Sequence, residues 1–228
     1  MPHSFKTVFL DIDDTLYDYQ LANNAGMLAA EKFFIQNFKI SKDSYNSSFR
    51  KARSHVKEIL GPVGSSHSRL LYFQSMLEIL NLKFSADTLL NLEKIYWNEY
   101  LENMSIFDGV YEFLKHLNDI NINISAITDL TLQIQLEKLA ALKVDHFFNY
   151  ITSSEEAGID KPHKKIFKIA LNKEGLDAND CAMIGDNYEK DILGAKNIGM
   201  VSFWKTSHEE QLEADFIFNN FHDLKQCF

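Results

Sequence analysis

Short apolar runs alternate with segments of helical periodicity along most of the chain. The first run, "TVFLDID" at 7–13, is almost continuously apolar, as expected of a strand that is covered on both faces. Further strands are expected at 122–129, 149–155, 181–186, 200–204 and, from a weaker pattern, 214–218. Helical segments are expected between them, at 109–119, 131–143, 163–175 and 188–197. This alternation predicts an α/β fold with a parallel, doubly wound sheet.

Residues 20–104 break the alternation. Apolar residues such as Leu70, Phe73 and Leu77 recur there at helical spacing, and only the turn-rich stretch "GPVGSSHS" interrupts the pattern. A helical block of this length is too long for a simple crossover between two strands. We therefore expect an α/β core of residues 1–19 and 105–228 and an inserted helical subdomain of residues 20–104.

Polar side chains follow three of the expected strands. Asp11 and Asp13 end the first strand, Thr128 and Asp129 end the second, and Asp186 ends the fourth. In an open parallel sheet, ligands bind outside the carboxyl ends of the strands, near the point where the strand order reverses. These side chains are remote in sequence, and we expect them to converge on one pocket.

The acidic residues in this set predict a cation site. Asp11 lies inside an apolar run, where a carboxylate loses hydration and needs a compensating partner. Together with Asp13 and Asp186 it offers the oxygen-rich environment that suits Mg²⁺. Asp14 and Asp18 fit a turn or a helix cap equally well.

Composition narrows the classes of partner. The chain of 228 residues has a formal net charge of −9, which argues against a nucleic-acid polymer as the main partner. It does not exclude a small phosphorylated ligand, because a metal ion and one lysine can reverse the field locally. No apolar run reaches 18 residues and the N-terminus lacks a signal peptide, so neither a membrane span nor secretion is expected. The two cysteines form no disulfide framework, which fits a cytoplasmic protein. The sequence does not indicate an oligomeric state.

The motifs "DIDDT", "ITD", "KPHKKIF" and "GDNYEKD", in this order, resemble those of the haloacid dehalogenase superfamily of phosphohydrolases. The phrases "TLYD", "KPHKKIF" and "GDNYEKDILGAKNIGM" most resemble its nucleotidase-like branch. The resemblance covers nearly the whole chain. It implies a Rossmann-like core, a mobile α-helical cap and Mg²⁺-dependent hydrolysis of a phosphomonoester. Leu130 departs from the pattern, because many members have a glycine there.

The resemblance also implies a role for each site residue. Asp11 would attack phosphorus and form an aspartyl-phosphate, and Asp13 would protonate the leaving group and later activate water. Neighbouring Asp11 and the substrate phosphate are expected to raise the pKa of Asp13, while the metal opposes them. Magnesium would be held by Asp11, the backbone carbonyl of Asp13 and Asp186, with Asp191 beside it or acting through water. The phosphoryl oxygens would be held by Thr128, the amide of Asp129, and Lys161.

Several activities share these features. The branch resemblance favours a nucleoside monophosphate or a similar small phosphorylated metabolite, with a sugar-phosphate or phosphoglycolate phosphatase as the alternative. A hydrolytic dehalogenase needs neither an acid at Asp13 nor a metal, and phosphosugar mutases usually have glycine where Asp14 stands. A non-catalytic phospho-sensor would have no use for the helical insertion. The aromatic residues of that insertion either stack on a base or form its core: Phe33, Phe34, Tyr72, Phe73 and Trp97.

Overall fold

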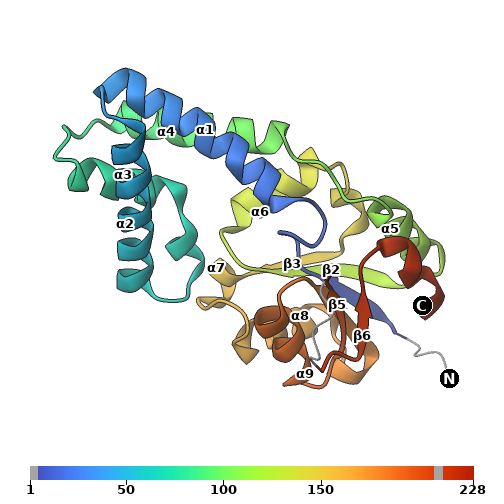
Figure 1. Ribbon diagram of the computed structural model, residues 1–228. Helices are drawn as coiled ribbons and strands as arrows, with labels where there is room; N and C mark the ends of the chain where they lie inside the picture. Colours follow the sequence, from blue (N-terminus) through green and yellow to red (C-terminus); the bar gives the residue numbers. More distant parts are fainter. Residues whose placement is uncertain (1–4, 208–212) are drawn as a thin grey trace. The chain divides into compact units, whose positions relative to one another are not determined.

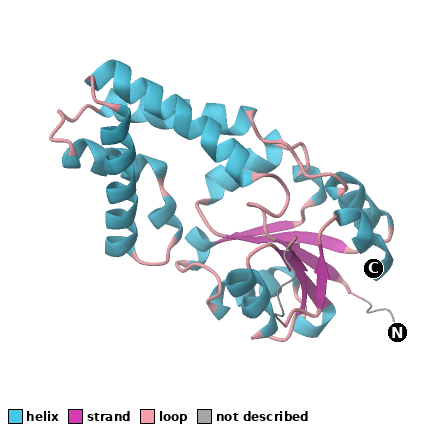
Figure 2. Ribbon diagram, viewed as in Figure 1, coloured by secondary structure: helices cyan, strands magenta, loops and turns pink. Residues whose placement is uncertain are grey.

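The computed structural model describes residues 5–207 and 213–228. The chain divides into two compact units. One consists of Met1–Asp18 and Ser105–Phe228, and the other of Tyr19–Met104. The first unit contains the β-sheet, and the second is helical (Figures 1 and 2).

Among the described residues, six strands form the sheet, and every neighbouring pair is parallel. Their order across the sheet is β3-β2-β1-β4-β5-β6. The strands are β1 (Thr7–Leu10), β2 (Asn123–Thr128), β3 (Tyr150–Ser153), β4 (Cys181–Gly185), β5 (Val201–Lys205) and β6 (Phe216–Phe218). The predicted α/β class with a parallel Rossmann-like sheet is confirmed.

Helices cover both faces of this sheet (Figure 1). One face carries α5 (Val110–Asp119), α6 (Leu132–Ala141) and the 3₁₀ segment η5 (Phe221–Cys227). The other face carries α8 (Lys164–Glu174) and the short α9 (Gly194–Lys196). The short elements α7 (Ser154–Ala157), η2 (Asp145–Phe147), η3 (Ala178–Asp180) and the π-helical η4 (Tyr188–Leu193) complete the unit.

The sheet core explains why β1 and β4 are apolar throughout. Both strands are completely buried along their length. On the face covered by α8, Phe9 and Met183 pack with Ile166 and Phe167 of that helix in one hydrophobic cluster. Because both faces of these central strands meet helices, their sequences show a continuous apolar run rather than an alternating one.

Several element boundaries differ from the sequence-based expectation. The first strand ends at Leu10 rather than at residue 13, because Asp14 adopts a positive φ of 59° and the chain turns there. The expected strand 149–155 divides into β3 and α7, where the Ser153 hydroxyl accepts the Glu156 amide and caps the helix. The expected helix 188–197 is the π-helical η4 followed by α9.

The helical unit contains four long helices and one 3₁₀ turn. They are α1 (Tyr19–Phe38), α2 (Lys42–Leu60), η1 (Gly64–His67), α3 (Arg69–Ile79) and α4 (Ala86–Glu102). Serine side chains cap the N-termini of α2, α3 and α4, each by accepting a backbone amide three residues on. The turn-rich stretch at 61–68 contains η1, as its composition suggested.

Aromatic side chains form the interior of this helical unit. Phe34 and Phe73 are fully buried, Tyr72 is 1% exposed and Trp97 is 7% exposed. Phe73 contacts the rings of Phe34 and Tyr96. Four of the five aromatic residues considered for base stacking therefore belong to the core, and Phe33 is half-buried. None of the described helices is long and apolar enough to cross a bilayer.

Candidate active site

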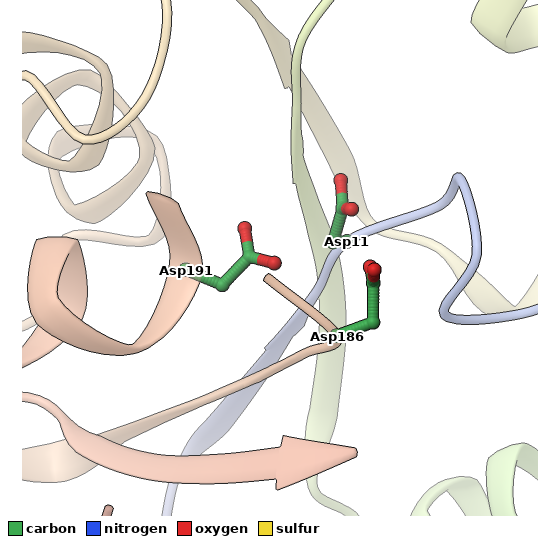
Figure 3. Close-up of side chains that lie close together, drawn as sticks. All are labelled: Asp11, Asp186 and Asp191. Atoms are coloured by element: carbon green, nitrogen blue, oxygen red, sulfur yellow. The ribbon is translucent and has the colours of Figure 1, made fainter. Parts of the chain in front are cut away.

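Three carboxylates converge at the carboxyl ends of neighbouring strands. Asp11 follows β1, Asp186 follows β4, and Asp191 lies in η4, which comes directly after β4. One oxygen from each lies within 4.8 Å of the others, and Figure 3 shows the three side chains around a common space. The chain runs from β1 outwards to β2 and β3 and then crosses to β4, so β1 and β4 flank the reversal of strand order. The predicted convergence of Asp11 and Asp186 is therefore observed.

The turn after β4 is built to bring Asp191 inwards. A Cβ atom on Gly185 would collide with the Asp191 carboxyl group, so only glycine allows this approach. The amide of Asn187 donates to Asp191 Oδ2 at 3.0 Å, and Asp191 is fully buried. The neighbouring Asp186 carboxylate accepts the Thr15 hydroxyl at 3.1 Å. The π-helical form of η4 is itself typical of functional sites.

Lys161 neutralises part of this acidic cluster. Its Nζ lies 2.7 Å from Asp11 Oδ1 and 2.6 Å from Asp191 Oδ1, and it is 4% exposed. Burial lowers the pKa of Lys161, but the charges of Asp11 and Asp191 outweigh burial and raise it well above its usual value. Lys190, the lysine within the motif "GDNYEKD", pairs with Asp129 instead. The cation that contacts Asp11 and Asp191 comes from the loop before α8.

One lysine does not balance three carboxylates. Burial raises the pKa of Asp11 well above its usual value; Lys161 opposes this, and the charges of Asp191 and Asp186 add to it. Burial and the Asp191 charge raise the pKa of Asp186 to about 6. A divalent cation would favour the ionised form of each group. Carboxylate oxygens are the ligands that Mg²⁺ prefers, so Asp11, Asp186 and Asp191 form a donor set that fits this ion.

The residues expected to hold phosphoryl oxygens lie at the same strand ends. Thr128 is the last residue of β2 and is 1% exposed. The Asp129 carboxylate accepts a hydrogen bond from the Lys161 backbone amide at 2.9 Å and another from the Lys190 ammonium group at 2.6 Å. Asp129 and Asp11 are therefore joined through Lys161, which contacts both. The structure brings these residues together, while their role on the phosphoryl group stays a prediction.

Leu130 occupies a backbone conformation that favours glycine. Its φ is +89°, its side chain is 8% exposed, and its amide donates to the Ser154 hydroxyl at 3.0 Å. A non-glycine residue in such a conformation costs of order 1–3 kcal/mol. Glycine would adopt this conformation without that cost. This chain forms the same positive-φ turn with leucine.

Asp13 points into a separate cluster on α6. Lys138 Nζ lies 2.6 Å and 2.9 Å from its two carboxylate oxygens, and Gln135 Nε2 lies 3.2 Å from Oδ2. The Tyr17 hydroxyl also donates to Asp13 Oδ1. Burial raises the pKa of Asp13, but the charge of Lys138 and these hydrogen bonds outweigh it, so the pKa is lowered. The sequence reasoning named Asp11 and the substrate phosphate as raising the pKa of Asp13 and the metal as lowering it, and left the balance open. In the free protein Lys138, which that reasoning omitted, decides the balance.

Three residues around the acidic groups escaped the sequence reasoning. Gln135 and Lys138 are buried partners of Asp13, and Lys190 pairs with Asp129. Gln135 and Lys138 stand three residues apart within the expected helix 131–143, which puts them on one face. Two polar residues on one helical face were the signal in the sequence that could have identified them. The helix was predicted from its apolar residues alone, so this signal was overlooked.

The sequence matches the family described as haloacid dehalogenase-like hydrolase over residues 5–199. A ribulose-1,5-bisphosphate 5-phosphatase of Halopiger xanaduensis is 34% identical over 194 residues, covering 85% of this chain and 81% of the relative. The pyrimidine 5′-nucleotidase YjjG of Escherichia coli is 30% identical over 159 residues, or 68% of each chain. The crystal structure of a HAD phosphatase from Thermococcus onnurineus matches with a TM-score of 0.76 at 19% identity, covering 97% of each chain. This last likeness concerns the fold.

Proposed function

Because the chain belongs to the haloacid dehalogenase-like hydrolases, we propose that it is a Mg²⁺-dependent phosphatase that forms an aspartyl-phosphate on Asp11. The predicted superfamily and enzyme class are confirmed by this membership and by relatives that are named phosphatases. The observation that carries the mechanism is the grouping of Asp11, Asp186, Asp191 and Lys161 at the switch point of the sheet.

The proposed reaction has two steps on the residues of this site. In the first, Asp11 attacks phosphorus, the bond to the leaving oxygen breaks, and a proton from the Asp13 carboxyl group goes to that oxygen. In the second, water attacks phosphorus, Asp13 takes a proton from the water, and the bond to Asp11 breaks. Thr128, the Asp129 amide and Lys161 hold the phosphoryl oxygens, where charge accumulates in the transition state. The sum is an alcohol and inorganic phosphate.

Magnesium would be held by Asp11, Asp186 and Asp191, together with the carbonyl of Asp13 and water. When bound, it supplies positive charge that offsets the repulsion among the carboxylates and the incoming phosphate. The raised pKa values of Asp11 and Asp186 support this assignment, since a bound cation would favour the ionised form of both groups.

Removal of the metal is expected to abolish phosphate release. Addition of a chelator should lower the rate by roughly 10²-fold or more, because a metal ion contributes several kcal/mol in such a site, and Mg²⁺ in excess should restore it. Asp186→Asn should raise the Mg²⁺ concentration needed for half-maximal rate, whereas Asp119→Asn, at an exposed carboxylate paired with Lys115, should not. Full activity in excess chelator would show that the acidic cluster serves another purpose.

For the substrate, we propose a small phosphorylated metabolite, with a sugar phosphate favoured over a nucleoside monophosphate. The relative that acts on a sugar bisphosphate covers more of this chain, at higher identity, than the relative that acts on pyrimidine nucleotides. The burial of Phe34, Tyr72 and Phe73 also removes three side chains that a base would have stacked on. A panel of sugar phosphates and nucleoside monophosphates, with phosphate release measured for each, tests this ranking. A cytoplasmic location follows from the metabolite class and remains part of the proposal.

We also propose that the helical unit is the family's cap and selects the leaving group. One polar cluster stands out within its aromatic interior. Arg69 is 6% exposed, lies 5.1–5.7 Å from the ring centroids of Tyr72, Tyr96 and Trp97, and has an Nε without a hydrogen-bond partner among the described residues.

The hydrogen-bond acceptors of Arg69 are neutral groups. They include the His67 carbonyl at 2.9 Å, the Tyr19 hydroxyl at 3.0 Å and the Asn23 side-chain oxygen at 3.4 Å. A buried cation is stabilised most by an anion, and each of these three acceptors is neutral. The cluster is therefore the part of the helical unit that we expect to affect substrate choice.

Substitutions in this cluster are expected to reorder substrates. Asn23→Ala and Arg69→Lys should change the ratio of kcat/KM between a sugar bisphosphate and a sugar monophosphate by about 10-fold or more, because unpaired buried polar groups discriminate strongly. Hydrolysis of p-nitrophenyl phosphate should change far less. Arg50→Lys, at an exposed arginine on α2, serves as the matched control. An unchanged ranking in variants with wild-type thermal unfolding would mean that this cluster is only structural.

A further inference from the structure

Helix α6 buries polar side chains beside an apolar one. Leu139 is fully buried, as expected, but so is Gln135, and Lys138 is 1% exposed, whereas Leu132 and Leu136 are 36% and 48% exposed. A helix on a sheet ordinarily buries its apolar stripe and exposes its charged residues. Burial of a lysine and an amide is unfavourable unless both find partners, so their burial indicates that these two side chains are placed for what they contact.

Both side chains contact Asp13. Lys138 reaches both carboxylate oxygens, at 2.6 Å and 2.9 Å, and Gln135 adds a bond of 3.2 Å to Oδ2. With the Tyr17 hydroxyl on Oδ1, the donors come from two directions and occupy most of the acceptor capacity of one carboxylate. The direction of the Asp13 side chain is therefore set by α6 as much as by its own backbone.

Gln135 also contacts the loop that follows β2. Its Nε2 lies 2.7 Å from Thr128 Oγ1 and 2.7 Å from the Asp129 carbonyl oxygen. The Gln135 side-chain amide has two hydrogens to donate, and three oxygens lie within hydrogen-bond distance: one each from Asp13, Thr128 and Asp129. The same NH₂ group therefore serves both Asp13 and the loop. A single buried side chain joins the proton-transfer residue to a residue proposed to hold the phosphoryl group.

We propose that Gln135 and Lys138 are positioning residues for the Asp13 carboxyl group. They direct it towards the leaving-group oxygen in the first step and towards the attacking water in the second. Gln135 also keeps Asp13 at a fixed position relative to Thr128 and the loop after β2. This inference rests on the proposed function, in which Asp13 transfers those two protons. Neither side chain is assigned contact with the substrate. Both act through Asp13, and Gln135 acts also through Thr128.

The test measures how strongly phosphorylation of the enzyme depends on the leaving group. Rapid-quench experiments give the rate of aspartyl-phosphate formation from a sugar phosphate, whose alkoxide needs a proton, and from p-nitrophenyl phosphate, whose phenolate does not. Lys138→Met should lower the ratio of the first rate to the second by at least about 10-fold, since positioned proton transfer contributes roughly 10² to 10⁴-fold. Lys138→Arg, which keeps a cation near Asp13, should recover most of the ratio.

Two control variants and a second test variant make the change in the rate ratio interpretable. Lys168→Met, at an exposed lysine on α8, and Gln133→Met, at an exposed position on α6, should leave the ratio unchanged. If Lys138→Met does not fold, Gln135→Met removes the amide at similar volume and should lower the ratio in the same way. Equal losses for both esters, or an unchanged ratio in folded variants, would overturn the positioning role.

The same experiment separates this inference from the proposed function. If wild-type enzyme forms no aspartyl-phosphate on Asp11, the proposed function fails. If Asp13→Asn lowers the ratio and Lys138→Met and Gln135→Met do not, the function stands and the positioning role alone is overturned.

Discussion

Asp11→Asn is expected to reduce steady-state phosphate release by roughly 10⁴-fold or more, since an amide cannot replace the carboxylate as nucleophile. The variant should still fold. Burial raises the pKa of Asp11, so the folded protein favours its neutral form, and the ionised carboxylate lowers stability at neutral pH. A neutral asparagine removes that cost, while Lys161 keeps its ion pair with Asp191.

Thermal unfolding of the metal-free protein checks the second half of this expectation. At pH 7 the midpoint of Asp11→Asn should equal or exceed that of wild type. The advantage should shrink as the pH falls towards 4, because Asp11 then becomes protonated in both the folded and the unfolded wild-type protein. Asp145→Asn, at an exposed aspartate, is the matched control for the loss of one charge. Appreciable turnover by Asp11→Asn, with deamidation excluded by mass, would remove Asp11 from the nucleophile's role.

Asp13→Asn is expected to separate the two chemical steps. A nitrophenolate leaves without protonation, so the variant should release a burst of nitrophenolate close to one equivalent per active site. The second step needs a base to activate water, and its loss should slow later turnovers by roughly 10² to 10⁴-fold. Aspartyl-phosphate should then accumulate on Asp11 and be detectable by mass after a rapid acid quench.

Alkyl esters should behave differently in the same variant. Their alkoxide leaving group needs the proton in the first step, so no comparable burst is expected from a sugar phosphate. Because Asp13→Asn also removes the anion beside Lys138, thermal unfolding is measured alongside to confirm the fold. Hydrolysis of sugar phosphates or nucleoside monophosphates near the wild-type rate would contradict the acid–base role. It would also weaken the distinction from a dehalogenase, which has no use for that proton.

The sequence predicted those features that follow from hydrophobic periodicity. The central strands β1 and β4 are covered on both faces, so their apolar runs are continuous and easily recognised. In a parallel sheet the carboxyl ends of all strands lie at the same edge. Asp11 and Asp186 each follow a strand, so this rule was enough to predict that they lie close together. The short elements around η4 were missed, because a π-helical turn and an α-helix bury the same apolar positions over so few residues.

The environment of Asp13 could not be read from its own motif. Its pKa depends on Lys138, which stands far away in sequence, and the apolar pattern of α6 does not predict that a lysine of this helix is buried. Long-range pairing of charged side chains leaves no periodic signal. The ion pair between Lys161, in the loop before α8, and Asp191, in η4, likewise leaves no periodic signal. Motif order located these residues near one pocket, and only the coordinates distinguish which carboxylate pairs with which lysine.

The position of β1 in the sheet has a consequence for the order of folding. This strand leaves the ribosome before the other strands of the sheet, yet its partners are β2, where Thr7 pairs with Asn123, and β4, where Thr7 pairs with Cys181. The helical unit lies between β1 and β2 in sequence and forms its contacts within one continuous segment, so it can fold while β1 still has two open edges. A nascent chain that ends before β4 leaves one edge of an apolar strand unpaired, which is a hazard for aggregation. Asp11 and Asp191 meet only when β4 docks on β1, so the acidic cluster assembles only after β4 has joined the sheet.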